Sequence, residues 1–74
     1  MSKLIRMDAS GHSTLAEWSA RDQASYEAAV RAFRHELDEG YVGVVSEGEG
    51  RATQVTELPA GADLVILRRP IAGG

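Results

Sequence analysis

One amphipathic segment limits what this 74-residue chain can fold into. Apolar residues recur in it at i, i+4, i+7 and i+11, the spacing of one face of an α-helix. Those residues are Tyr26, Val30, Phe33 and Leu37, with Ala29 beside them. N-cap candidates at Asp22 and Ser19, and a glycine suited to the left-handed conformation at Gly40, predict a helix over residues 22–39. The chain therefore has a single helix with which to cover a sheet.

Two short segments before this helix have the composition of strands. Residues 3–9 are β-rich, and residues 13–20 alternate weakly between apolar and polar side chains. Ala16 and Trp18 share one side of the second segment. Residues 10–12 form a plausible tight turn between the two, so we expect a hairpin.

Three more β-rich segments follow the helix. Residues 41–47 and 51–58 flank a glycine-rich turn at 48–50, and a turn at 59–61 leads into a last strand at 63–69. The element order is then β-β-α-β-β-β. This order predicts an α+β fold in which one helix packs on one sheet.

The last predicted strand contains four consecutive apolar residues, from Leu64 to Leu67. An unbroken apolar run between turns is typical of a central strand that is buried on both faces. One helix covers only one face of a sheet, so either Leu64 and Ile66 or Val65 and Leu67 point away from it. We therefore expect an apolar surface on the far face, covered by a binding partner, by loops or by a second copy.

Composition and charge narrow the classes of function. The chain has no cysteine, which excludes disulfides and thiolate zinc sites and suits a reducing cytoplasm. A net charge of −3 disfavours binding to nucleic acid, because phosphate contacts need a basic face. The longest apolar run is far too short for a membrane span. We expect a cytoplasmic protein that binds neither nucleic acid nor membranes.

The histidines do not indicate an active site. His12 lies in the first predicted turn near Asp8 and Ser13, where crowded polar residues are typical of turn chemistry rather than of a catalytic triad. His35 lies away from the apolar stripe, so we expect it to be a solvated surface residue. Two histidines without cysteine make a poor metal site. The chain is therefore predicted to be neither an enzyme nor a metal-binding protein.

Other polar and aromatic residues are interpreted structurally. The acidic residues Glu36, Asp38 and Glu39 predict a solvated end of the helix. Trp18 and Tyr41 are predicted at the edges of the core rather than as ligand platforms.

The end of the sequence carries a resemblance to a known family. A hairpin, one long helix and further strands followed by Gly73-Gly74 resemble the β-grasp fold of ubiquitin-like proteins. The last stretch is similar to the bacterial sulfur carriers, namely the small subunit of molybdopterin synthase and the thiamine-biosynthesis carrier. The matching features are Leu58, the turn at 59–61, Asp63, the apolar strand at 64–67, Pro70, Ile71-Ala72 and Gly73-Gly74. Arg68 and Arg69 depart from the carrier pattern and look more like ubiquitin.

The resemblance implies a domain organisation and a site. It implies a β-grasp domain over residues 1–69, with one helix on a mixed sheet, and a flexible tail over residues 70–74. The functional residues are then Gly73 and Gly74, and no resident cofactor is expected. The implied partners are an adenylating enzyme of the ubiquitin-activating type, an acceptor protein or sulfur-acceptor enzyme, and a deconjugating protease of the JAB type.

The tail has a physical logic for such a role. The reactive group is the α-carboxylate of Gly74, and two residues without Cβ atoms let the chain thread into a closed site. Pro70 ends the strand, and Arg68 and Arg69 are suited to dock an acidic rim on the enzyme. Modifier and sulfur carrier both remain open, and Lys3 is the one lysine through which side-chain-linked polymers can grow. The alternative is a non-catalytic β-grasp interaction module or accessory subunit that binds through its exposed sheet face.

Overall fold

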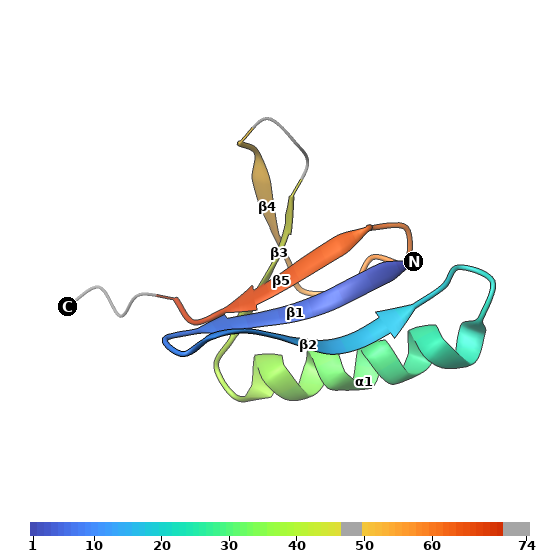
Figure 1. Cartoon of the computed structure of the whole chain (residues 1–74), viewed down its shortest axis with the longest axis horizontal. Helices are drawn as coiled ribbons and strands as arrows, with labels where there is room; N and C mark the ends of the chain where they lie inside the picture. The colour runs from blue at the N-terminus through green and yellow to red at the C-terminus, as the bar shows by residue number, and fades with distance from the viewer. Residues whose placement is uncertain (47–49, 71–74) are drawn as a thin grey trace.

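A computed structural model describes residues 1–46 and 50–70 of the chain (Figure 1). These residues form one helix packed on a five-stranded mixed sheet, which confirms the predicted α+β class and element order. The elements are β1 (Ser2–Asp8), β2 (Gly11–Trp18), α1 (Gln23–Asp38), β3 (Val42–Ser46), β4 (Ala52–Val55) and β5 (Leu64–Arg68). Within the described ranges, no helix has the length and apolar character needed to cross a membrane.

The last strand lies at the centre of the sheet, as its apolar run predicted. The strand order is β2-β1-β5-β3-β4, with β5 parallel to β1 and antiparallel to β3. Val65 and Leu67 are fully buried towards the helix, whereas Leu64 and Ile66 are only half-buried. The prediction that both faces of this strand are buried is therefore wrong in part. The helix covers one face of the sheet, and apolar side chains remain on the other, as expected for a sheet with a single helix.

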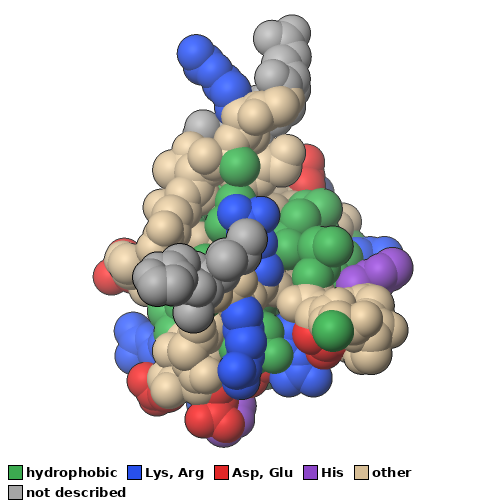
Figure 2. All heavy atoms as spheres, turned by 90° about the vertical axis from the view of Figure 1, so that its left-hand side faces the viewer, with side chains coloured by type: hydrophobic (Ala, Val, Ile, Leu, Met, Phe, Trp, Pro, Cys, Tyr) green, Lys and Arg blue, Asp and Glu red, His purple; other side chains and the backbone are tan. Residues whose placement is uncertain are grey.

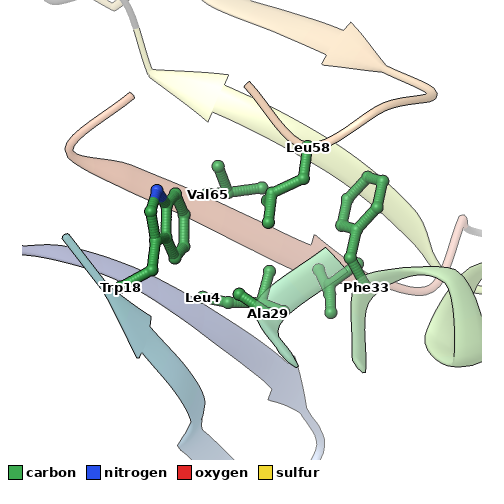
Figure 3. Packing of buried hydrophobic residues seen from close by; sticks show 7 residues of the cluster. Leu4, Trp18, Ala29, Phe33, Leu58 and Val65 are labelled. Carbon is green, nitrogen blue, oxygen red and sulfur yellow. The ribbon is translucent and has the colours of Figure 1, made fainter. Parts of the chain in front are cut away.

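The core lies between α1 and the sheet (Figure 3). Trp18 was predicted at the edge of the core, yet it is fully buried inside it. Its indole Nε1 donates a hydrogen bond to the carbonyl oxygen of Ala60 at 3.1 Å, which satisfies the one polar atom of the buried ring. The buried cluster consists of Leu4, Trp18, Ala29, Phe33, Leu58, Val65 and Leu67.

Both predicted ends of the helix are confirmed. The side chain of Asp22 accepts a hydrogen bond from the backbone N–H of Ser25 at 3.2 Å, so Asp22 is the N-cap. At the other end, Gly40 has φ of 99°, a conformation that side chains other than hydrogen disfavour.

The predicted first hairpin is present, but the bounds of its turn differ from the prediction. Strand β2 already begins at Gly11, so the turn occupies residues 9–10 rather than 10–12. Leu4 pairs with Ala16 while the next residue, Ile5, pairs with Thr14, which leaves Leu15 as the extra residue of a β-bulge. Because of this bulge, the two neighbouring side chains Leu15 and Ala16 both pack against the core.

The strand predicted over residues 51–58 is shorter in the structure, where β4 covers Ala52–Val55. The chain leaves the sheet because Leu58 turns inward and is only 4% exposed. Its carbonyl oxygen accepts a hydrogen bond from the hydroxyl of Tyr26 at 2.6 Å. Tertiary packing therefore replaces strand pairing for these residues.

Two predicted features fall largely outside the described residues. Of the turn at 48–50, only Gly50 is described, and its φ of 77° suits a turn glycine. Of the tail predicted at 70–74, only Pro70 is described, so the site residues Gly73 and Gly74 lie outside the described ranges.

Candidate functional site at the tail root

Residues 68–70, here called the tail root, leave the sheet from its central strand. Arg68 is the last residue of β5 and pairs with Val42 of β3. Arg69 and Pro70 follow outside the strand, and all three residues are exposed. Pro70 has no N–H group with which to extend the ladder. The tail root lies at the end of the sheet opposite the N-terminus (Figure 1).

Arg69 packs against an aromatic ring at this end of the molecule. Its Cζ atom lies 5.1 Å from the centroid of the Tyr41 ring, and the Cζ atom of Arg6 lies 5.7 Å from the same centroid. Both distances are within the range of cation–π interactions. Tyr41 is half-buried, which agrees with its predicted place at the edge of the core.

Arg6 is held by a buried carboxylate. Its Nη1 donates to Oε1 of Glu36 at 2.6 Å, and this hydrogen bond raises the pKa of the guanidinium above its usual value. The prediction that Glu36 is solvated is therefore wrong, since this residue is only 5% exposed. The helix turns it inward, onto the sheet face that carries Arg6. We call Arg6, Glu36, Tyr41 and Arg69 the Tyr41 cluster.

His35 borders this cluster from the outside. Its side chain is 72% exposed, as predicted for a surface residue, and its Nε2 lies 4.0 Å from Oε2 of Glu36. No group of three potential metal ligands is found in the part of the chain that the structure describes.

Arg68 approaches the opposite face of the sheet. It lines a shallow hollow with Met7, Val44 and Ile66, the apolar side chains that the helix does not cover. Met7 is 47% exposed. Figure 2 looks onto the end of the molecule that carries the tail root, where basic side chains adjoin hydrophobic ones. Of the two predicted docking arginines, Arg69 contacts the Tyr41 ring and Arg68 lines this hollow, and both line a second hollow beside Met7.

Asp8 makes the contacts expected of a turn residue. Its Oδ1 accepts hydrogen bonds from the backbone N–H of Ser10 at 2.9 Å and from the Ser10 hydroxyl at 2.6 Å. Both hydrogen bonds lower the pKa of Asp8 below its usual value of 3.8, and the bond from the Ser10 hydroxyl has the larger effect. The positive charge of Arg6 lowers this pKa further. The described side-chain contacts of Asp8 go to Ser10 and, at 3.9 Å, to Nε of Arg6 rather than to His12 or Ser13, in line with turn chemistry.

The lowered pKa of Asp8 predicts a pH-dependent stability. The ionised carboxylate stabilises the fold above its unfolded-state pKa, and this contribution is lost as the pH falls through the lower folded-state pKa. We expect Asp8→Asn to lower the free energy of unfolding near neutral pH and to have a smaller effect in acid. Urea denaturation of both proteins on either side of pH 3.8 measures this difference.

The control for this prediction changes Ser10, whose hydroxyl donates a hydrogen bond to Asp8. Ser10→Ala removes the hydroxyl and leaves the backbone N–H, so it should reduce the pH-dependent contribution of Asp8 without abolishing it. An equal loss of stability from Asp8→Asn at all pH values would contradict the assignment.

Most of the Tyr41 cluster is not predicted by the sequence patterns. They indicate a docking role for Arg69, give no role to Arg6 and place Glu36 in solvent. A signal was present, because Arg6 lies two residues after Leu4 in an extended segment and so shares the face on which Leu4 is buried. A charge on a core-facing position needs a partner of opposite charge.

Comparison with known proteins gives no relative on which to base an assignment. No protein-family model, curated protein or solved structure matches the chain significantly.

Proposed function

We propose that this chain is a β-grasp, ubiquitin-like protein that an ATP-dependent enzyme activates at the α-carboxylate of Gly74. The β-β-α-β-β-β order, with the first and last strands parallel at the centre of the sheet, is compatible with a β-grasp fold. The observation that carries the proposal is the passage from this central strand into two exposed arginines, a proline and the Gly73-Gly74 pair.

The chemistry of the proposed step follows from the reactive group. A carboxylate is a poor electrophile, so its oxygen first attacks the α-phosphate of ATP, forming an acyl adenylate and releasing pyrophosphate. An amine then displaces AMP and loses a proton, which gives an amide bond. Alternatively, hydrosulfide attacks the same carbonyl carbon, AMP leaves, and loss of a proton gives a thiocarboxylate. The first product defines a protein modifier and the second defines a sulfur carrier.

The described residues suit this role in two ways. Strand β5 is paired on both sides, to β1 and to β3, so the tail starts from a firmly held position. Arg68 and Arg69 are exposed at that start, where positive charge can steer encounter with an acidic rim on the enzyme.

If this protein is a modifier, few of its own side chains can serve as acceptors when it forms polymers. Lys3 is the one lysine of the chain, and it is exposed on β1. It pairs with Leu64 at the start of β5, so it lies at the end of the sheet opposite Arg68. Side-chain-linked polymers would therefore join opposite ends of successive copies.

Mass spectrometry of an N-terminally tagged copy from the native host tests the proposal. Trypsin cleaves after Arg68 but not between Arg69 and Pro70, so the released peptide begins at Arg69. We expect this peptide to end at Gly74 and to be either branched onto lysines of other proteins or changed by one sulfur in place of one oxygen. A peptide that is always unmodified, or that continues beyond Gly74, would contradict activation at this residue.

One observation favours a second candidate function, an interaction module without C-terminal chemistry. The far face of the sheet exposes Met7 beside the half-buried residues Val44 and Ile66. Apolar side chains left open on a small domain mark a possible partner surface. The same tagged copy distinguishes this candidate, because a module would retain its partners while Gly74 stays unmodified.

A further inference from the structure

We propose that Tyr41 is a positioning residue that holds the root of the tail through Arg69. Its importance for activation rests on the function proposed above, whereas its contact with Arg69 does not. The inference comes from the Tyr41 cluster, in which one half-buried ring receives two guanidinium groups.

The ring is supported from the helix. Tyr41 directly follows Gly40, the left-handed residue at the end of α1. Its backbone N–H donates to the carbonyl oxygen of Glu36 at 3.0 Å, so its position is tied to the last turn of the helix.

Arg6 supports the ring from the sheet. The backbone of this residue is paired with Ser13 of β2 and with Leu67 of β5. Its guanidinium is held by the buried carboxylate of Glu36 at 2.6 Å. An arginine anchored at both ends leaves the Tyr41 ring little freedom to rotate away.

The carboxylate of Glu36 compensates the charge of Arg6, so a second cation can lie close to the same ring. Two guanidinium groups close to one ring repel each other unless a negative charge compensates one of them. Glu36 supplies that charge to Arg6, and Arg69 then contacts the same ring with its Cζ atom 5.1 Å from the centroid. Oε2 of Glu36 also lies 4.0 Å from the exposed His35 ring, which is on the solvent side of the cluster.

Holding Arg69 restricts where the reactive group can be. Gly74 lies five positions after Arg69 in the sequence, a separation that even a fully extended chain spans in no more than about 17 Å. The next residue, Pro70, has a fixed φ, which removes one freely rotating torsion between Arg69 and the tip. A tail that starts in one direction loses less conformational entropy when an enzyme binds it.

Nuclear magnetic resonance of Tyr41→Leu and Tyr41→Phe tests the contact. The leucine variant keeps apolar bulk and removes the π face, whereas the phenylalanine variant keeps the face and removes the hydroxyl. We expect the side-chain protons of Arg69 to show a ring-current shift in the wild type and in Tyr41→Phe, and to lose it in Tyr41→Leu. Identical Arg69 shifts in the wild type and in Tyr41→Leu would overturn the proposal.

A second set of variants guards against misfolding of Tyr41→Leu. Glu36→Gln leaves Tyr41 in place but removes the negative charge that compensates Arg6. The uncompensated Arg6 should repel Arg69 and so reduce the ring-current shift of Arg69. Arg69→Gln removes the tail half of the contact and leaves the folded domain unchanged, so beyond position 69 and its chain neighbours its spectrum should differ from the wild type only around Tyr41. If the resonances around Tyr41 do not change in Arg69→Gln, the proposed contact is also overturned.

The consequence for activation is measured separately. At equal expression in the native host, we expect Tyr41→Leu to lower the modified fraction of Gly74 about two- to five-fold, the effect of losing one exposed cation–π contact. Arg69→Gln should lower it at least as much, because it also removes a charge suited to docking. Tyr41→Phe should match the wild type. An unchanged fraction in Tyr41→Leu would overturn the positioning role. Absence of any Gly74 modification in the wild type would instead refute the proposed function, while the Arg69 shifts would still report on the contact.

Discussion

Gly43→Ala is expected to lower the free energy of unfolding by about 1–3 kcal/mol, the usual cost of overpacking a core. A Cβ atom at this position would lie 2.5 Å from Cε1 and 2.8 Å from Cζ of Phe33. Phe33 is fully buried, so its ring cannot swing into solvent to make room. A domain of this size has a total stability of about 4–11 kcal/mol, so the loss is a substantial fraction. Urea denaturation of the purified proteins measures it.

A double-mutant cycle isolates the clash. Phe33→Leu alone should also destabilise, because it removes buried apolar volume. In the double variant, however, the smaller side chain leaves space for the new methyl group of Gly43→Ala. The combined loss should therefore be clearly smaller than the sum of the two single losses. Additive losses would contradict direct packing of Phe33 on Gly43.

Deletion of Gly74 is expected to abolish both the conjugates and the thiocarboxylate proposed for the C-terminal carboxylate, while leaving the stability of the fold unchanged. The deletion moves the carboxylate back by one residue, so an enzyme that threads the full tail no longer receives it at the reacting position. Strand β5 ends at Arg68, well before the deletion, so the core and the sheet keep all their described contacts. The measurements are the modified fraction by mass spectrometry and the urea midpoint.

A matched variant on the far face separates the two candidate functions. Met7→Asp places a charge on the exposed apolar surface beside Ile66 without entering the buried core. An interaction module should lose its partners in this variant and retain them when Gly74 is deleted. A modifier or carrier should lose its products when Gly74 is deleted. Full biological activity of the Gly74 deletion would refute activation at that residue.

Local patterns in the sequence determined the elements and their order. The helix follows from the apolar stripe and from its end signals at Asp22 and Gly40, because capping and helical periodicity act between residues a few positions apart. The central place of β5 likewise followed from its unbroken apolar run. These features depend on short-range geometry, which a sequence displays directly.

Contacts between distant residues were decided only by the tertiary structure. Glu36 looks solvated in an acidic helix end, but packing of α1 on the sheet brings it to Arg6, thirty positions away. Leu58 looks like part of a strand, yet it turns into the core below Tyr26. The Tyr41 cluster arises in the same way, since strand pairing brings Arg6 and the tail root to one end of the sheet. Such partners are chosen by burial and charge compensation across the fold, and spacing along the chain does not encode them.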